Sequence, residues 1–450
     1  MSLIAETSNL DTLWPYHPDL LARPVPRYTS YPTAMEFSGS VSAPEYREAL
    51  LGVEPATSLS LYVHIPYCHE ICWYCGCNTG AANRKQRLDA YIESLEQEIV
   101  NVARLVAGRG KVTRIAFGGG SPNAIELVDF VRIVDRLMIL FSADNPAISV
   151  EIDPRSFTLE WAQMLASIRA TRVSLGVQTF APHVQAAIGR IQPVELIENC
   201  VSSLRLRGIE QVNFDLMYGL PGQSLADLED TIAIAIKMRP TRIALFGYAH
   251  LPTMIPRQRR IDGSTLPDAE LRFQQSQRGH KMLVDAGYKA IGFDHFALPD
   301  DAIAQAADRG AVHRNFQGFT EDDSQVMLGF GASAISKFPH LLAQNIKNVG
   351  AYRDAVQSGN LPIERGITLN DEDQITGQVI EQLLCQGTAD LDPDVADAIW
   401  PRLSNFAQRG LLIRETNRIV IPEAGRPYSR LISSQFDKYR DTSIKAANHN

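Results

Sequence analysis

Short β-rich runs alternate with helical patterns along most of this chain. The β-rich runs cover residues 59–65, 113–120, 147–153, 171–180, 211–221, 241–249 and 288–296. Apolar residues at steps of three and four predict helices over 88–102, 124–141, 158–168, 194–207, 225–237 and 268–286. Several β-rich runs are nearly continuously apolar, as buried parallel strands are. This alternation predicts an α/β fold on a parallel sheet, either open or closed into a full or partial barrel.

Polar residues recur where the predicted strands end. They are the glycines after Phe117, then Glu151, Gln178, Asp215, Tyr248 and the pair Asp294–His295. The carboxyl ends of parallel strands share one edge of the sheet, and active sites of α/β folds assemble there. We therefore expect a functional site at this edge.

Composition and charge narrow the class of protein. A formal net charge of −8 over 450 residues argues against a general binder of nucleic acid or acidic membranes. The first residues, MSLIAETSNLDTLWPYHPD, lack the basic and apolar regions of a secretory signal, and no window approaches the ~18 apolar residues of a membrane span. The sequence predicts a cytoplasmic protein, where thiols stay reduced and a cysteine cluster indicates metal binding or catalysis.

The stretch HIPYCHEICWYCGCN, residues 64–78, holds Cys68, Cys72, Cys75 and Cys77. The remaining cysteines, Cys200 and Cys385, lie in apolar-periodic segments and are expected in the core. Because the cysteine stretch follows the first predicted strand, it falls at the edge where the polar residues converge.

Three kinds of metal site compete for these thiols. Structural zinc normally uses two separated ligand pairs, although His64, His69 and Cys77 could complete a local tetrahedron. A [4Fe–4S] cluster with four thiolates does not match the spacing C-x3-C-x2-C-x-C. A [4Fe–4S] cluster on Cys68, Cys72 and Cys75 would leave one iron free for a small molecule, and the position of the loop favours this third interpretation.

The second predicted strand ends in GGGSP, Gly118 to Pro122. Glycines there let backbone N–H groups approach a ligand, although a tight turn needs glycine too. The run matches neither the dinucleotide pattern nor a P-loop.

With these motifs, the chain resembles the oxygen-independent coproporphyrinogen III oxidase family of the radical S-adenosylmethionine (SAM) superfamily. The resemblance covers nearly the whole chain and includes PRYTSYPTA, YVHIPYC, EIDPR, GVQTF, DLMYGLPGQ, YAHLPT, GFDHFALPDD, HRNFQGFT and GASAIS. It implies a partial (β/α)6-type barrel. It divides the chain into an N-terminal extension contributing to the active site (1–50), the barrel (51–300), a segment covering the active site (301–364) and a smaller, mainly helical C-terminal domain (365–450).

The resemblance also implies the ligands of the site. Cys68, Cys72 and Cys75 would hold the [4Fe–4S] cluster, and Cys77 would not. The resemblance further implies two SAM molecules, contacted by the residues that match the family's positions: Tyr62, Tyr74, Gly119, Gly120, Ser121, Glu151, Gln178, Arg190, Asp215, Ala249 and Ile335. Without the motif, Arg190 would be taken for a surface charge, and either tyrosine for ordinary core.

The implied reaction is the oxidative decarboxylation of two propionates of coproporphyrinogen III to vinyl groups, giving protoporphyrinogen IX in haem biosynthesis. In the superfamily, one electron from the cluster cleaves SAM to a 5′-deoxyadenosyl radical, which here would remove a β-hydrogen. No catalytic acid–base pair is expected. The implied partners are the substrate and a reduced flavodoxin- or ferredoxin-like protein, with the chain a monomer. By charge alone, Arg27, Arg257, Arg259, Arg260 and Arg314 are candidates for binding the tetracarboxylate substrate.

Some positions depart from the family pattern. Glu70 stands where a lysine is common, GGGSPN replaces GGGTPT, GRIQ (189–192) replaces NREQ, and Phe319 replaces a tyrosine. Ser121 keeps the hydroxyl and Arg190 is retained. Phe319 lacks the phenol hydroxyl of the family's tyrosine. If that hydroxyl contacts the substrate in the family, substrate binding differs in this chain.

After about residue 365 the pattern becomes helix–helix–hairpin–helix, which resembles a winged helix. With no basic stripe, a domain capping the barrel is favoured over a DNA-binding one. Two rival functions remain: a related radical-SAM-type haem chaperone, which PRYTSYPTA and Cys77 disfavour, and a zinc-stabilised DNA-binding protein. The closing residues KAANHN are expected to be disordered.

Overall fold

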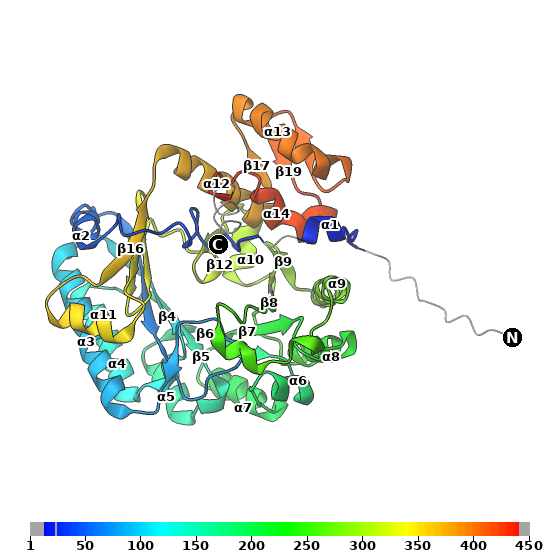
Figure 1. The fold of residues 1–450 in the computed structure, drawn as a ribbon. Coiled ribbons are helices and arrows are strands. Elements are labelled where there is room, and N and C mark those ends of the chain that lie inside the picture. The colour runs from blue at the N-terminus through cyan, green and yellow to red at the C-terminus, as the bar shows by residue number, and fades with distance from the viewer. Residues whose placement is uncertain (1–12, 23–24, 441–450) are drawn as a thin grey trace.

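A curved twelve-stranded sheet forms the centre of the computed structural model, which describes residues 13–22 and 25–440 (Figure 1). The strands from β13 through β1 and β4 to β8 run parallel to one another, and both ends of the sheet are antiparallel. In spatial order they are β16 (Ile363–Thr368), β15 (Leu341–Asn345), β14 (Ile335–Phe338), β13 (Val326–Phe330), β1 (Ser58–Ile65), β4 (Lys111–Gly119), β5 (Ala147–Ile152), β6 (Ala170–Gln178), β7 (Gln211–Tyr218), β8 (Arg242–Gly247), β10 (His295–Ala297) and β9 (Lys289–Ile291).

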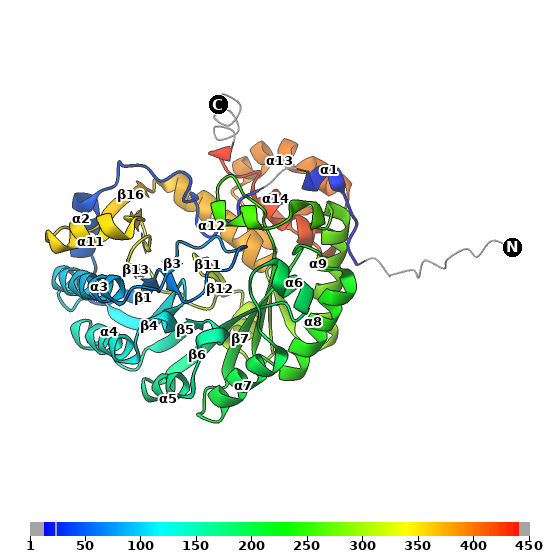
Figure 2. The same cartoon turned by 60° about the horizontal axis from the view of Figure 1, so that its bottom comes forward.

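A layer of helices covers the convex side of this sheet, as Figure 2 shows. They are α3 (Lys85–Val106), α4 (Leu127–Leu140), α5 (Leu159–Ser167), α7 (Val194–Arg205), α8 (Leu225–Met238) and α9 (Ala269–Asp285), with the short α6 (Pro182–Ala187) before α7. Each follows one of the parallel strands β1 and β4 to β8. The expected partial barrel of six β/α units is therefore confirmed.

The side chains of the parallel strands alternate in character between the two faces of the sheet. In β1, Leu59, Leu61 and Val63 are fully buried under the helices, whereas Ser60 points to the opposite, concave face and lines a cavity there. The later strands repeat this alternation, so the concave face carries most of the polar side chains described below. The nearly continuous apolar character expected of several strands is confirmed in β4 and β8, where residues 115–117 and 243–245 are buried in succession, whereas β5, β6 and β7 alternate.

The predicted strand 288–296 is in fact two short strands with a turn between them. Gly292 has φ +57 in the turn, and an added Cβ there would lie 2.1 Å from the ring of Phe319. As a result β10 turns back and pairs antiparallel with both β8 and β9. The prediction of a further parallel strand was wrong, because this glycine reverses the chain.

The remaining elements lie beside the barrel. Ahead of β1 are α1 (Pro18–Leu21) and α2 (Ala43–Leu51), and after β10 come α10 (Ala302–Asp308), the hairpin β11 (His313–Asn315) and β12 (Gly318–Thr320), and α11 (Val349–Gln357). The C-terminal part contains α12 (Asp371–Gln386), β17 (Thr388–Asp390), α13 (Pro393–Gln408), β18 (Ile413–Glu415), β19 (Arg418–Val420) and α14 (Ser429–Ser433).

The C-terminal elements pack against the barrel and the N-terminal segment, with α1 beside α13 and α14 (Figure 1). Trp14 and Phe273 of α9 share one apolar cluster with Leu403 and Tyr428. The expected closing helix is shorter than predicted: residues Glu423–Tyr428 form a 3-10 helix that contains Pro427, and only Ser429–Ser433 are α-helical.

Cys200 and Cys385 are buried, as predicted. Within the described ranges, none of the helices has the length and apolar character needed to cross a membrane. The closing KAANHN and the first twelve residues, on which the leader prediction partly rests, lie outside those ranges.

Candidate active site

The cysteine loop begins just after β1 and is closed at its base by two short strands. β2 (Tyr67–Cys68) pairs with β3 (Gly80–Ala81), and the N–H of Ala82 donates to the carbonyl of Cys68 at 2.8 Å. Because β1 ends at Ile65, this pairing fixes the loop at the carboxyl edge of the sheet. This is the edge at which the sequence predicts a functional site.

Beneath the loop lies a cavity of about 190 Å³, called here the cluster cavity. The loop forms one wall, and the carboxyl ends of β4 to β7 form the others. Most of the predicted site residues line it: Cys68, Cys72, Tyr74, Cys75, Gly119, Gly120, Glu151, Gln178, Arg190 and Asp215. The structure therefore brings together residues that are spread over nearly 150 positions of the sequence.

Each of the three predicted ligand thiols has a polar neighbour. The Sγ of Cys68 lies 3.2 Å from Oγ1 of Thr79, and the Sγ of Cys75 accepts the backbone N–H of Cys77 at 3.4 Å. A hydrogen bond from the Cys77 thiol lowers the pKa of Cys75 to about 6, while burial raises the pKa of Cys68 to about 11. Cys77 therefore acts as a hydrogen-bond donor to the sulfur of Cys75.

The donor chemistry of the cluster cavity fits an iron–sulfur cluster. Three thiols from one short loop line one cavity, and thiolate ligands are the ones that hold such clusters. In the part of the chain that the structure describes, no three His, Cys, Asp or Glu side chains lie close enough together to hold a single metal ion. The thiols are spread around a space instead of converging on a point.

Two arginines attach the loop to the barrel through Cys72. Nη1 of Arg190 and Nη2 of Arg155 lie 3.2 and 3.4 Å from the Sγ of Cys72. Both guanidinium groups also pair with Asp153, at 3.2 Å from Arg190 and 2.6 Å from Arg155. Arg155 further donates to the carboxylate of Glu70 at 2.9 Å and to its backbone carbonyl at 3.1 Å.

Asp153 and Arg155 were missed as site residues by the sequence reasoning, although both belong to the EIDPR motif. Their importance follows from contacts with a loop about 80 positions earlier, which residue spacing does not reveal. The same contacts explain the departure at Glu70: a carboxylate there accepts from Arg155, which a lysine could not do.

The glycine run is required for close packing as well as for access to the cavity. A Cβ on Gly119, which has φ +112, would lie 2.7 Å from the His64 ring. A Cβ on Gly120 would lie 2.5 Å from the carbonyl oxygen of Tyr67. Gly120 therefore lets the cysteine loop rest directly on the end of β4.

Two carboxyl groups face the cavity from β5 and β7, the strands on either side of β6. Burial and the nearby carboxyl of Asp215 raise the pKa of Glu151 to about 7, and the N–H of Gly119 donates to Glu151 at 3.3 Å. Burial also raises the pKa of Asp215, which accepts from Asn213 at 3.0 Å and from Ser174 at 3.3 Å. Ser174 and Asn213 are further residues that sequence reasoning missed, and inward alternation along β6 and β7 is the signal that could have found them.

Four of the predicted SAM contacts do not line the cluster cavity. The hydroxyl of Tyr62 is hydrogen-bonded to Nδ1 of His64 at 3.1 Å. Ser121 is buried, bonds to the side chain of Asn123 and accepts the N–H of Asp153, so it supports the turn after β4. Ala249 is exposed in the segment after β8, and Ile335 begins β14.

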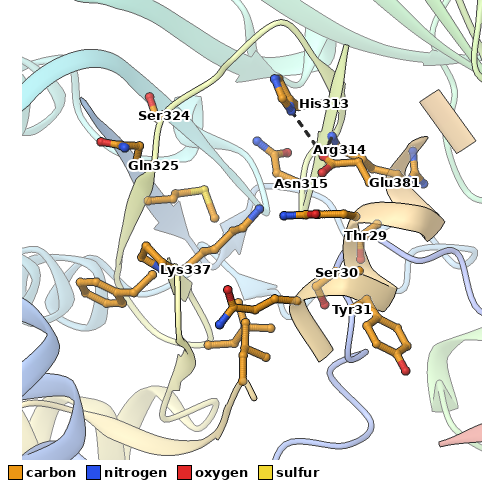
Figure 3. Close-up of a pocket in the computed structure, with 18 of the residues that line it drawn as sticks. Thr29, Ser30, Tyr31, His313, Arg314, Asn315, Ser324, Gln325, Lys337 and Glu381 are labelled. Atoms are coloured by element: carbon orange, nitrogen blue, oxygen red, sulfur yellow. Dashed lines mark hydrogen bonds and ion pairs between the residues drawn. The ribbon is translucent and has the colours of Figure 1, made fainter. Parts of the chain in front are cut away.

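Two further cavities adjoin the first. The barrel cavity, about 350 Å³, shares Glu151 and Ser174 with the cluster cavity, and it is also lined by His295 and Phe319. The lateral cavity, about 400 Å³, shares Ser60 and Asn315 with the barrel cavity. In Figure 3, Lys337 extends into the lateral cavity toward Asn315, while His313 pairs with Glu381 at its rim. The three cavities thus follow one another through shared lining residues.

Buried ion pairs line the barrel cavity at the start of the strands. Asp301 accepts from Nε of Arg242 at 2.8 Å and from Arg172 at 3.0 Å, and Arg242 also pairs with Glu321 at 2.8 Å. Burial alone would raise the pKa of Glu321, but Arg242 and its neighbours lower it to about 2. The amino ends of the strands therefore carry a structural network, and the carboxyl ends carry the loop.

The predicted substrate arginines are in different environments. Arg259 and Arg260 are exposed, and Arg260 stacks on Trp73 at 5.2 Å. Nη2 of Arg257 donates to the carbonyl of Thr79 at 3.3 Å, beside the cysteine loop. Arg27 and Arg314 lie together on the other side of the barrel mouth and are described below.

Comparison with known proteins agrees with this geometry. Residues 62–235 match the model of the radical SAM superfamily. The oxygen-independent coproporphyrinogen III oxidase of Bradyrhizobium diazoefficiens is 38% identical over 93% of this chain and 95% of its own. The enzyme of that name from Escherichia coli is 37% identical over 92% of this chain and 93% of its own. A solved structure of coproporphyrinogen III oxidase from E. coli, described as a radical SAM enzyme, superposes with a TM-score of 0.88 at 36% identity, over 95% of this chain and 100% of that one.

Proposed function

This chain belongs to the family of oxygen-independent coproporphyrinogen III oxidases within the radical SAM superfamily, and from this premise we propose how its residues serve the reaction. The enzyme converts two propionates of coproporphyrinogen III into vinyl groups with loss of CO2, giving protoporphyrinogen IX. The related haem chaperone is not favoured, because relatives at 33–38% identity over more than 90% of the chain carry the oxidase name.

The observation that carries the proposal is the cluster cavity itself. Cys68, Cys72 and Cys75 would hold a [4Fe–4S] cluster, with Cys77 donating to Cys75 instead of binding iron. A bound cluster together with SAM would supply the radical chemistry that removes hydrogen from a propionate. Arg190 and Arg155, which donate to the sulfur of Cys72, stabilise the charge of a thiolate there.

The remaining residues of the cluster cavity would bind and orient SAM. The carboxyl groups of Glu151 and Asp215 are suited to accept from hydroxyl or ammonium groups, and the glycines bring backbone N–H groups close. Burial of these groups excludes water, which protects a reactive species. The resemblance implies two SAM molecules. We assign the second molecule to the barrel cavity, because this cavity shares Glu151 and Ser174 with the cluster cavity.

We further propose the domain organisation, the electron donor, the location and the oligomeric state of the enzyme. It consists of an extension, a barrel, a covering segment and a C-terminal cap, divided at residues 50, 300 and 364, and Trp14 of the extension packs in one cluster with Tyr428 of the cap. A reduced flavodoxin- or ferredoxin-like protein would supply the electron, and the enzyme would act as a cytoplasmic monomer.

An anaerobic assay tests the function. The protein, reconstituted with iron and sulfide, is given a low-potential reductant, SAM and coproporphyrinogen III, and the product mass and CO2 are measured. We expect loss of two carboxyl groups per substrate. SAM cleavage with intact substrate would assign the radical chemistry to another substrate, and haem binding without decarboxylation would favour the chaperone.

A further inference from the structure

Three arginines from distant segments gather around Phe293 and the neighbouring Asp294. Arg314 of β11 lies 5.0 Å from the ring of Phe293, and Arg430 of α14 lies 5.3 Å from the same ring. Arg27, from the segment before β1, lies 5.5 Å from the ring of Phe246 at the end of β8. We call Arg27, Arg314 and Arg430 the arginine group.

The arginine group has hydrogen-bond donors to spare. Arg314 donates through Nε and Nη2 to the carbonyls of Arg27 and Tyr28, but its Nη1 is buried without a partner in the described residues. Within the same residues the side chain of Arg430 forms no hydrogen bond or ion pair, and that of Arg27 donates once, to the carbonyl of Gly247 at 3.1 Å. A guanidinium group has five N–H donors, and buried donors without acceptors cost free energy.

The positive charge of the arginine group is not balanced. The carboxylate that acts on Arg314 and Arg430 is that of Asp294, and it already accepts from His295 at 2.7 Å. Burial, together with repulsion from Arg430 and Arg27, lowers the pKa of Arg314, and burial lowers that of Arg430. The nearby Arg426, by contrast, pairs with Glu423 at 3.0 Å. In a chain of net charge −8, this excess of cations at one place calls for an anion.

The arginine group adjoins the cavities described above. Phe319, which stacks on Arg314 at 4.3 Å, and His295, whose ring lies 5.2 Å from that of Phe319, both line the barrel cavity. Gly247, the acceptor for Arg27, ends β8 at the carboxyl edge. An elongated ligand in the barrel mouth could therefore have one end at the arginine group and another at the cluster cavity.

We propose that Arg27 and Arg430 bind the carboxylate of a propionate that does not react. Arg314 positions Arg27 by donating to the backbone carbonyl of Arg27. The inference rests on the proposed function, whose substrate carries four carboxylates. Guanidinium groups bind carboxylates in two-point contacts, and Phe293 offers an apolar surface to the methylene groups. The N-terminal extension and the C-terminal domain thereby each contribute one substrate residue, and Arg430 was not among the sequence-based candidates.

The test compares Arg430→Ala, Arg430→Lys and Arg27→Ala with the unaltered enzyme under anaerobic conditions. We expect KM for coproporphyrinogen III to rise about 10- to 100-fold in the alanine variants, with a smaller rise for lysine. SAM affinity and cluster content stay unchanged. Arg418→Ala, which removes an exposed arginine from the same C-terminal domain, serves as the control and keeps the original KM.

Other outcomes are decisive too. Weakened SAM binding with unchanged KM for the substrate would show that the arginine group serves the carboxylate of SAM, and would overturn the proposal. An unchanged KM in Arg430→Ala and Arg27→Ala would overturn it as well. Arg27 is exposed, so its variant stays informative if Arg430→Ala melts early. If the unaltered enzyme leaves coproporphyrinogen III intact, the proposed function fails first, and this inference falls with it.

Discussion

Nη1 of Arg190 lies 3.2 Å from the sulfur of Cys72, although 118 positions separate the two residues. The contact joins the cysteine loop to the segment after β6. It also places a permanent positive charge beside a thiol that is a proposed ligand. The loop therefore depends on the barrel both for its position and for its electrostatic environment.

Single replacements of the cysteines should distinguish those that bind the cluster from Cys77, which only neighbours them. Cys68→Ala, Cys72→Ala and Cys75→Ala are each expected to lose the [4Fe–4S] cluster, because each removes one of three thiolates. Cys77→Ala should retain it. The cluster content of each variant is measured after anaerobic reconstitution, as iron and sulfide per chain and as visible absorbance. A Cys77→Ala protein without iron, or a Cys72→Ala protein with full iron, would contradict the assignment.

Arg155 is expected to stabilise the cysteine loop more than its exposed partner Glu70 does. Arg155→Ala removes donors to Cys72, Glu70 and Asp153, so the cluster should be lost several-fold faster to an iron chelator. Glu70→Gln removes only the outer ion pair, whose carboxylate is 72% exposed, and should behave almost as the unaltered protein. Equal rates of cluster loss in all three proteins would show that Arg155 has no such role.

The buried carboxyl of Glu151 should make the SAM-free protein less stable at higher pH. Its pKa, raised by burial and Asp215 to about 7 from 4.5, means that the folded state holds a proton that the unfolded state releases. Folding stability from this group is therefore highest at pH below 4.5, falls as the pH rises through 7, and stays reduced above it.

Replacing Glu151 by glutamine removes this titration. Relative to the unaltered protein, the melting temperature of Glu151→Gln should rise between pH 5 and pH 8 by roughly 2–4 °C, as expected for about 2.5 kcal/mol in a chain of 450 residues. The exposed Glu195→Gln serves as the control and should follow the unaltered protein at both pH values. A constant difference between Glu151→Gln and the unaltered protein at all pH values would be incompatible with a raised pKa.

The ion pairs lining the barrel cavity should contribute strongly to stability. The carboxylate of Asp301 is 1% exposed and pairs with Arg172 and Arg242, so Asp301→Asn leaves two buried cations undercompensated. Loss of one partner of a buried pair costs about 3–5 kcal/mol. Thermal melting should show a drop of several degrees, whereas the exposed neighbour Asp300→Asn should melt as the unaltered protein does. Equal melting of both variants would exclude this role.

Much of the fold was predictable because each β/α unit repeats a local pattern. The helix-facing residues of β1 and the apolar stripe of α3 mark one such unit. Six units in order predict a parallel sheet, open or closed into a barrel, and the resemblance indicated the partial barrel. The prediction failed where a single residue decides the direction of the chain, as Gly292 does between β9 and β10. It also missed the polar concave face, because alternation is hard to recognise in short strands.

The site was predictable where residues belong to compact motifs and was not where side chains meet across the fold. The cysteine loop and the glycine run were identified from spacing, position and resemblance. Tyr248 was expected with the other strand-end residues, but it is buried and its hydroxyl bonds to His250 at 2.9 Å. Ser121 likewise bonds to protein groups, and the arginine group depends on Arg430 from the far end of the chain.

The most direct test of the account is the electron paramagnetic resonance spectrum of the reduced, reconstituted protein, recorded with and without SAM. If three cysteines leave one iron open, that iron is available to bind SAM. We predict that adding SAM shifts the g-values of the reduced [4Fe–4S] cluster, in the unaltered protein and in Cys77→Ala alike. A cluster signal that SAM leaves unchanged would contradict the central claim that the cavity beneath the cysteine loop is where cluster and SAM meet.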